Sequence, residues 1–301
     1  MNLNSGIRLV LLAAIWGASF LFMRISVPVI GAPAVADLRV LLAAVFLVCV
    51  AVLIKQKLEF KKHWKHYFLL GLFNSALPFL LFSYAALHLQ ASLLSILNAT
   101  APIWGCLIAV IALRQTVPLK TVFGLVLGVA GVVGILGFDV QVFQKGLLWP
   151  CLAAVGAAFC YGVASIYARY ANSVEPFNNA HGSMWSSALI LLPLVFAFAP
   201  RELAANDLLS VKLMGSLLTL GVVCTGVAYL MYFRLIEDVG PASALTVTFL
   251  VPVFGVLWGH LFLNEPIGWP VLVGGVSVVT GTMLVTNFSL RSLFQRKKAY
   301  V

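Results

Sequence analysis

The sequence predicts an all-α integral membrane protein with ten transmembrane helices, arranged as two inverted five-helix repeats. The first observation behind this prediction is composition: hydrophobic residues make up 62% of the chain and charged residues only 9%. A soluble domain carries about 25% charged residues, so this chain is expected to lie in lipid. The second is a series of apolar stretches, each long enough to cross a bilayer. The third is a pattern in the first half of the chain that returns in the second.

The repeated pattern occupies residues 102–131 and returns at residues 252–281, a spacing of 150 residues. Eight of its 30 positions are identical. Roughly 3 identities would be expected by chance, because the chain is rich in Leu, Val and Gly. Because the spacing is about half the chain, we interpret the sequence as a tandem duplication, with one five-helix repeat at 1–140 and the other at 141–301. The identities are Pro102, Gly105, Leu107, Leu113, Gly124, Val126, Val129 and Gly131, which recur as Pro252, Gly255, Leu257, Leu263, Gly274, Val276, Val279 and Gly281.

The N-terminal stretch could be mistaken for a secretory signal, because Arg8 precedes an apolar run that leads to Ala34-Val35-Ala36. Its segment WGASFLFMR at 16–24 is echoed by YGVASIYAR at 161–169, deep inside the chain. A cleaved signal has no reason to share such an echo. We therefore expect a helix of the mature protein here.

A helix needs about 20 apolar residues to cross the hydrocarbon core. Dividing the chain at charges, prolines and glycines gives ten such stretches, and the connections between them are too short for a sizeable soluble domain. The predicted helices are Ile7–Val27, Ala34–Ile54, His66–Leu87, Ala91–Leu113, Lys120–Leu136, Gly146–Ala168, His181–Ala199, Lys212–Ile236, Pro241–Leu263 and Pro270–Asn287.

Lysine and arginine predict the orientation, because they accumulate on the cytoplasmic side of a membrane. Placing the lysine-rich connector 55–65 inside puts both termini in the cytoplasm and 14 of the 19 basic residues on the inner side. We expect a multi-pass protein of the plasma membrane, the inner membrane in a bacterium. The inner residues are Arg8, Lys55, Lys57, Lys61, Lys62, Lys65, Arg114, Lys120, Arg169, Arg234, Arg291, Arg296, Lys297 and Lys298; the outer ones are Arg24, Arg39, Lys145, Arg201 and Lys212.

An odd number of helices in each repeat means that the second copy must enter the membrane upside down. Inverted repeats allow one sequence pattern to form two related gates, one at each membrane face, and so to provide alternating access. The net charge of +10 sits in short loops, which indicates contact with anionic membrane lipids and no nucleic-acid partner.

Three predicted helices carry a polar residue four positions before a proline. Proline cannot bond to the carbonyl four residues earlier, so the helix bends and a polar group is freed. In lipid such a group is tolerated against protein or a water-filled cavity, which favours substrate binding, although ordinary kinks would give the same pattern. The pairs are Asn74 with Pro78, Asn98 with Pro102, and Thr248 with Pro252, the last two being equivalent positions of the repeat.

Aromatic and hydroxyl side chains share faces of three further predicted helices. Such faces can line a pocket for amphipathic organic molecules, although a stripe of aromatic residues also serves for packing. The substrate-binding candidates are Trp16 and Ser19 beside Met23, Tyr161 and Ser165, and Tyr229 and Tyr232 in line with Thr225.

Ionisable residues inside predicted helices are informative because each costs about 2.5–3.5 kcal/mol at a helix centre. Arg24, Asp37 and Arg39 could form an outer gate, or could extend to the headgroups. His260 is the candidate for proton coupling, and Glu265 is a gating candidate or a structural anion at the end of its helix. Arg234 is predicted to pair with Glu237 and Asp238 on the inner side.

Small residues and interfacial aromatics complete the prediction. The glycines of two equivalent helices let backbones approach closely, either within the fold or between the protomers of a homodimer. Trp64, Tyr67, Trp149 and Trp269 lie near predicted helix ends and are expected to be interfacial anchors. The glycines are Gly124, Gly128 and Gly131, and Gly274, Gly275 and Gly281.

The chain resembles the EamA family of the drug/metabolite transporter superfamily over nearly its whole length. The resemblance rests on WGASF at 16–20, on Pro33 followed by Arg39 and Ala43, and on ASALTVTFLVPVFGVLWGHLFLNEP at 242–266 with GGVSVVTG at 274–281. It implies a secondary transporter, typically an inner-membrane exporter of small metabolites, amino acids or drugs. Two positions depart from the family pattern: Gln115 stands where the second half has Glu265, and Arg39 has no basic counterpart after Pro176.

The leading expectation is therefore a secondary active transporter of small organic solutes that exports them by alternating access, with protons as a candidate coupling ion. The chain has no GxxxxGK[ST] motif, which argues against an ATP-driven pump, and we expect no cofactor and no metal ion. The alternatives are a channel or a non-transporting membrane receptor. A membrane-embedded enzyme ranks third, because no HExxH motif or carboxylate pair is evident.

Overall fold

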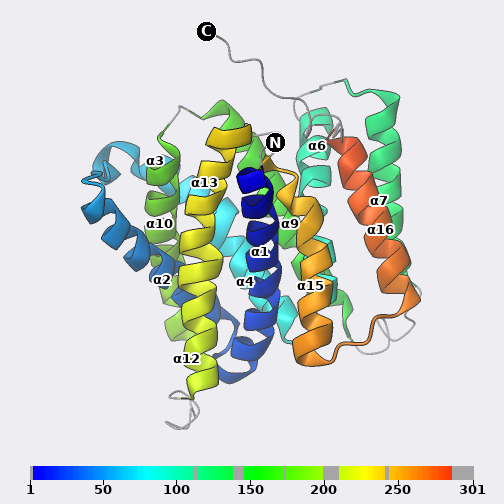
Figure 1. Ribbon diagram of the computed structural model, residues 1–301, viewed down its shortest axis with the longest axis horizontal. Coiled ribbons are helices and arrows are strands. Elements are labelled where there is room, and N and C mark those ends of the chain that lie inside the picture. Colours follow the sequence, from blue (N-terminus) through cyan, green and yellow to red (C-terminus); the bar gives the residue numbers. More distant parts are fainter. Residues whose placement is uncertain are drawn as a thin grey trace.

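The computed structural model describes residues 3–111, 114, 116–137, 146–171, 174–198, 210–240 and 244–286, and every regular element in these ranges is a helix. Among the described residues, seven helices are long and apolar enough to cross a membrane, and three shorter apolar helices accompany them. The chain is thus a multi-pass membrane protein. The helix α1 begins, and α16 ends, at the same end of the bundle (Figure 1), which we call the N-terminal end.

In the described part of the first half, the helices form five segments, of which the third and fourth are each subdivided. Their limits agree with the predicted ones within a few residues, except that the third segment begins six residues earlier than expected, at Phe60. The elements are α1 (Leu3–Ile30), α2 (Ala32–Leu53), α3 (Phe60–Gly71), η1 (Leu72–Ala76), α4 (Leu77–Ala86), α5 (Ala91–Asn98), α6 (Ala101–Ile111) and α7 (Leu119–Gly137).

The second half follows the same order. Its second helix begins at Pro176 instead of His181, and α15 begins at Val247 after a turn at 245–246. The elements are α9 (Leu148–Tyr170), α10 (Pro176–Phe198), α12 (Val211–Leu218), η2 (Thr219–Val227), α13 (Ala228–Val239), α15 (Val247–Leu263) and α16 (Trp269–Val285). Outside the described residues lie Leu113, Gln115, Lys145, Ala199, Arg201, Pro241, Asn287, Arg291, Arg296, Lys297, Lys298 and the predicted boundary at 140–141.

Two stretches of π-helix interrupt equivalent helices of the two halves. The stretch η1 precedes Pro78, which lacks the N–H that an α-helix would require there. The stretch η2 has no proline and lies at the corresponding place, about 150 residues later. Such wide turns are rare and often mark functional sites.

The prolines that are equivalent in the repeat have different effects. Before Pro102 the helix breaks at 99–100, so that α5 and α6 are separate. In contrast, α15 continues through Pro252, and the turn falls earlier, at 245–246. The helix is therefore interrupted before the equivalent proline in both halves, but at different distances from it.

The helices of one half pack against those of the other in a reciprocal manner. The helix α1 packs on α15, while its counterpart α9 packs on α6. A Cβ added at Gly17 would lie 2.9 Å from the backbone nitrogen of Gly255, and one at Gly162 would lie 2.8 Å from that of Gly105. Because Gly17 corresponds to Gly162 and Gly255 to Gly105, the two contacts are the same contact made twice.

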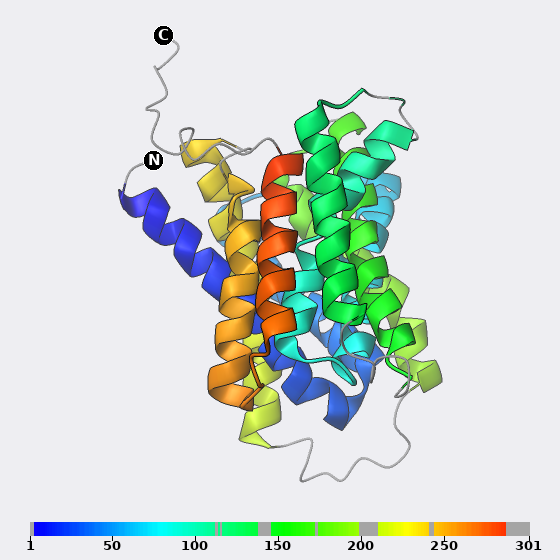
Figure 2. The ribbon, with the colours of Figure 1, turned by 90° about the vertical axis from the view of Figure 1, so that its right-hand side faces the viewer.

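The helices α7 and α16 lie side by side at one edge of the bundle (Figure 2). A Cβ at Gly124 would lie 2.8 Å from the carbonyl oxygen of Gly281, and one at Gly131 would lie 2.9 Å from that of Gly274. The prediction that these glycines serve close packing within the fold is confirmed.

The surface of the bundle is apolar, as a lipid environment requires. Ile111, Phe196 and Trp269 expose more than two thirds of their surface. Tyr67 is an exception among the aromatics expected at the interface: it is fully buried and its ring packs against Gly182. The prediction for Tyr67 is wrong because α3 begins earlier than expected, which carries this residue into the bundle.

Candidate functional site

Arg39 lies inside the bundle, with 6% of its surface exposed. Its Nε donates a hydrogen bond of 2.9 Å to the Thr225 hydroxyl, and its guanidinium carbon lies 3.7 Å from the centre of the Phe79 ring. One Nη approaches the Met23 sulfur at 3.9 Å. A hydroxyl, an aromatic face and a thioether are all neutral, so none of these partners cancels the positive charge.

The partners of Arg39 are held in place by the helices around it. The Thr225 hydroxyl donates to the carbonyl of Leu220, five residues earlier in the wide turn of η2, and so keeps its lone pairs for Arg39. The Met23 sulfur also receives the Ser83 hydroxyl at 3.8 Å. Thus α1, α2, α4 and η2 all contribute to the surroundings of one guanidinium.

Aromatic rings surround this group. Trp16 lies 5.3 Å from Tyr232, centre to centre, and Phe82 lies 6.3 Å from Tyr161. The Asn74 amide, in η1, donates to the Tyr229 hydroxyl at 2.9 Å. We call the whole group the central cluster; it consists of Trp16, Phe20, Met23, Arg39, Asn74, Phe79, Phe82, Ser83, Tyr161, Thr225, Tyr229 and Tyr232.

Two rings of the central cluster, those of Tyr161 and Tyr229, lie close to Arg39. Tyr161 and Tyr229 interact electrostatically with Arg39 and are enclosed by protein. Each nevertheless keeps part of its surface accessible. Polar groups that converge among aromatic rings are typical of small-molecule sites.

The structure brings together five of the predicted substrate-binding residues: Trp16, Asn74, Tyr161, Tyr229 and Tyr232. Two further candidates have other roles beside them. The Ser19 hydroxyl bonds to the carbonyl of Trp16 on its own helix, and Pro78 is buried at the start of α4. Ser165, in contrast, is exposed, and its hydroxyl donates to the carbonyl of Gly162.

The remaining pairs stand apart from the central cluster in the described part of the chain. The Thr248 hydroxyl donates to the Leu245 carbonyl on its own helix at 2.8 Å. Asn98 is half-buried at the break between α5 and α6. Pro102 lies in α6, and Pro252 lies in α15. For these four residues a role in binding stays a prediction.

The three residues of the predicted outer gate do not contact one another. The Arg24 guanidinium donates to the Ala86 carbonyl at the end of α4, at 2.7 Å. Asp37 is buried, and its Oδ1 finds no hydrogen-bond partner in the described structure. Arg39 belongs to the central cluster. Residues two apart on a helix point in different directions, which separates Asp37 from Arg39.

Glu265 lies against the start of α5, and its role in gating stays a prediction. Its buried carboxylate accepts hydrogen bonds from the backbone N–H groups of Ala91, at 2.6 Å, and Ser92, at 3.0 Å, and from the Ser92 hydroxyl. It thereby caps α5, whose first N–H groups have no partner within the helix. His260 is exposed and its Nδ1 lies 3.0 Å from the Glu265 carbonyl, so it stands apart from the central cluster; its role in proton coupling stays a prediction.

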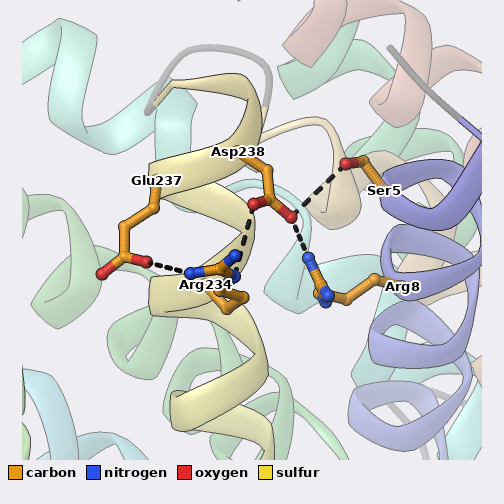
Figure 3. Close-up of polar contacts among 5 residues, drawn as sticks. All are labelled: Ser5, Arg8, Arg234, Glu237 and Asp238. Atoms are coloured by element: carbon orange, nitrogen blue, oxygen red, sulfur yellow. Dashed lines mark hydrogen bonds and ion pairs between the residues drawn. The ribbon is translucent and has the colours of Figure 1, made fainter.

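A second polar group joins α1 to α13 at the N-terminal end (Figure 3). Arg8 and Asp238 form an ion pair, and the Ser5 hydroxyl approaches the same carboxylate at 3.4 Å. Arg234 pairs with Glu237 at 3.0 Å and with Asp238 at 3.3 Å, which confirms the ion pairs predicted for these three residues. Asp238 therefore links two helices that are more than 200 residues apart in the sequence.

Two surface hollows of the described structure lie elsewhere. One follows the start of α7, from Leu119 to Val126, and the other lies between the start of α1 and Met231 of α13. None of the predicted binding residues lines them. The central cluster thus remains the better candidate for a solute site.

The sequence indicated some members of the central cluster only indirectly. Phe79 and Phe82 looked like ordinary apolar residues, although Phe79 directly follows Pro78. Arg39, a candidate for an outer gate or for contact with the headgroups, instead points inward. The sequence showed no sign of the two wide turns except Asn74, in η1, four positions before Pro78 of α4.

Comparison with known proteins identifies the family. The model of the EamA-like transporter family matches residues 4–137 and again residues 148–287. The chain is 23% identical to the "Uncharacterized transporter YoaV" of Bacillus subtilis over 282 residues, covering 93% of this chain and 96% of that protein. It is also 23% identical to a "Probable terminal-alkyne amino-acid exporter" of Streptantibioticus cattleyicolor, covering 99% and 98%.

A solved crystal structure shares the fold. It superposes with a TM-score of 0.65 at 16% identity and covers 97% of this chain and 100% of that one. Family, relatives and apolar helices agree. The chain therefore belongs to the EamA-like transporter family and is a membrane transporter of small solutes.

Proposed function

We propose that the protein is a secondary active exporter of small organic solutes, and that it works by alternating access between two inverted five-helix halves. The observation that carries this proposal is the reciprocal packing of the two halves around one central cluster. A solute held there lies between the two units that would have to move. The relative described as an amino-acid exporter supports outward transport.

The reciprocal contacts support a two-fold relation between the halves. Gly17 approaches Gly255 as Gly162 approaches Gly105, and the family model matches the chain twice. If each half has five crossings, the second must be inverted relative to the first. Exchange of conformations between such halves opens the site to one face and then to the other.

The polar group at the N-terminal end supplies a gate in this scheme. It ties α1 to α13 through Arg8 and Asp238, and the same two helices meet at the central cluster through Trp16 and Tyr232. Movement of α1 against α13 would therefore open a path from this end to the cluster. Partly exposed ion pairs contribute only about 0.2–1 kcal/mol each, so such a gate can open in every cycle.

We assign the N-terminal end to the cytoplasm of the cell and the protein to the inner membrane, because the basic residues of the 55–65 connector lie near this end. The opposite end carries the contacts of Arg24 with α4 and of Glu265 with α5. Proton coupling and a homodimer, both expected from the sequence, stay predictions.

Cysteine accessibility in intact cells tests the inverted arrangement. In a background that lacks the five native cysteines, one variant would carry Lys57→Cys and another Leu148→Cys. The proposal expects a membrane-impermeant maleimide to label Leu148→Cys from outside and Lys57→Cys only after permeabilisation. Labelling of both from the same face would contradict the two inverted halves.

Solute counterflow in proteoliposomes tests the transport mechanism. A carrier that alternates its access exchanges labelled for unlabelled solute without net flux, and the rate saturates with solute concentration. Ohmic single-channel currents without counterflow would instead show a channel. The variant Asn74→Leu should slow counterflow, because the amide that holds Tyr229 would be lost.

A further inference from the structure

Arg39 is a buried cation that no carboxylate neutralises in the described part of the chain. The ion pairs there involve Arg8, Lys62, His63 and Arg234, but not Arg39. The ionisable groups that interact with it are Tyr161, Cys224 and Tyr229. A charged side chain within a membrane helix is costly unless it is paired, and by default it indicates a functional site.

The acidic residues in its surroundings cannot act as the missing partner. Asp37 is on the same helix but two positions away, and it points to another side. The Glu265 carboxylate is occupied by Ala91 and Ser92, and Asp238 lies at the N-terminal end of the bundle. An anion that neutralises Arg39 must therefore come from outside these residues.

The guanidinium keeps its free donors for such an anion. Its Nε is held by Thr225, whereas no oxygen of the described residues accepts a hydrogen bond from either Nη atom. The planar fork of arginine fits the two oxygens of a carboxylate, and charge-assisted hydrogen bonds of this kind are about twice as strong as neutral ones. Phe79 lies against the guanidinium and fixes its plane.

The surroundings also limit the rest of the ligand. One cation balances one negative charge, and no carboxylate is near to receive an ammonium group. The rings of Phe79 and Tyr161 lie beside the charge. Those of Trp16 and Tyr232 extend the aromatic surface of the cluster. These features favour a monoanion with an apolar or aromatic body over a cation or a dianion.

We propose that Arg39 binds the carboxylate of the transported solute, and that the solutes are organic monocarboxylates with an apolar or aromatic body. The inference rests on the proposed transport function and names its substrate class. Thr225 is then a positioning residue, because it holds the Nε edge of Arg39 and leaves the other edge free.

The test compares each carboxylate with its neutral amide, which has nearly the same shape. The purified full-length chain in nanodiscs would be titrated with hippurate, indole-3-acetate, phenylacetate and hexanoate and with the four corresponding amides, using tryptophan fluorescence. The wild type should bind at least one carboxylate at least tenfold more tightly than its amide. The variant Arg39→Gln should lose this preference, and Arg39→Lys should keep only part of it, since a lysine lacks the planar fork.

A matched control separates this effect from a change in net charge. Lys212→Gln removes one positive charge from an exposed position at the start of α12 and should leave the preference unchanged. Thermal unfolding of each variant confirms that it is folded, and Arg39→Lys provides the test if Arg39→Gln is not. A wild type that binds every carboxylate and amide alike, or a folded Arg39→Gln that keeps the preference, would overturn the proposal.

Failure of this inference can be told from failure of the transport proposal. Equal counterflow of carboxylates and amides would retain the transporter and remove the role of Arg39. A preference for carboxylates in binding, without counterflow of any solute, would retain the role of Arg39 and remove the transport mechanism.

Discussion

The two halves of the molecule make the same backbone contact with each other twice, but with different side chains. In one copy of this contact, α2 of the first half passes Gly221 of η2 in the second half, where a Cβ would lie 3.1 Å from the Arg39 carbonyl oxygen. In the other, α10 passes Gly71 next to η1, where a Cβ would lie 2.8 Å from the carbonyl oxygen of Ser183. Arg39 thus corresponds to Ser183 in space.

The chemistry at these two positions differs. The Ser183 hydroxyl bonds to the Ala180 carbonyl on its own helix, and the Ser187 hydroxyl bonds to the Gly71 carbonyl. These groups satisfy each other, whereas Arg39 keeps a charge without a counter-ion in the described residues. The comparison teaches that the two halves share their backbone packing, while the charge without a counter-ion stands at only one of the two equivalent positions. Mutations in the backbone contacts between the halves should therefore change stability, and mutations around Arg39 should change binding.

The largest effect on stability is expected from a change in the backbone contacts between the helices. A Cβ in Gly162→Ala would lie 2.8 Å from the Gly105 nitrogen, so α9 and α6 must separate, and the free energy of unfolding should fall by up to about 3 kcal/mol. On the same helix, a Cβ at Gly156 would meet only Leu81, at 3.6 Å. Gly156→Ala should thus leave the stability unchanged or raise it. Thermal unfolding in detergent measures both, and equal melting temperatures would contradict the close contact.

The cap on α5 should come next. Glu265→Ala would leave the N–H groups of Ala91 and Ser92 buried without an acceptor, at a cost of about 1–2 kcal/mol in unfolding free energy. Glu265→Gln introduces the residue type that the first half has at the equivalent position, Gln115. It keeps one acceptor oxygen, so the loss of unfolding free energy should be smaller. Thermal unfolding of the two variants tests this order; no difference between alanine and the wild type would refute the cap.

A smaller effect is expected when the hydrogen bond that orients Arg39 is removed. Thr225→Val removes the acceptor of its Nε, which is worth about 1 kcal/mol and should weaken carboxylate binding several-fold. Thr219 lies in the same wide turn, but its hydroxyl bonds to the Gly215 carbonyl. Thr219→Val should leave binding unchanged. Tryptophan fluorescence titration of both variants compares them, and equal losses would indicate a general effect on η2.

The smallest effect is expected at the N-terminal end. Asp238→Asn weakens the link between α1 and α13, while Glu237→Gln removes only a contact within α13. A partly exposed pair contributes about 0.2–1 kcal/mol, so opening should become up to about fivefold more frequent in Asp238→Asn alone. The labelling rate of a cysteine at Leu12, which is buried between these helices, measures this. Equal rates in the two variants would exclude the proposed gate.

Much of the fold could be predicted from the sequence, because hydropathy and repetition are properties of whole segments. The helices could be predicted from the lengths of the apolar stretches, and the close packing of α7 and α16 could be predicted from their glycines. Trp16 and Tyr161 drew attention because they are equivalent in the repeat, and both lie in the central cluster. These signals depend on patterns and not on the direction of a single side chain.

The remaining features depend on direction and register, which the sequence does not contain. Whether Arg39 points to the headgroups or into the bundle is decided by the rotation of α2, and this is set by packing against η2 and α10. For the same reason, Thr248 could not be distinguished from Asn74, although one bonds to its own helix and the other to Tyr229.

The wide turns give the bundle a further capacity. A helix with such a turn contains one residue more than its length requires. If this surplus residue moves along the axis, the side chains that it passes rotate by about 100°, while both ends of the helix stay in place. Asn74 and Thr225 lie in the two wide turns. A local rearrangement of this kind would turn either side chain about the helix axis, without any displacement of the helix ends in the lipid.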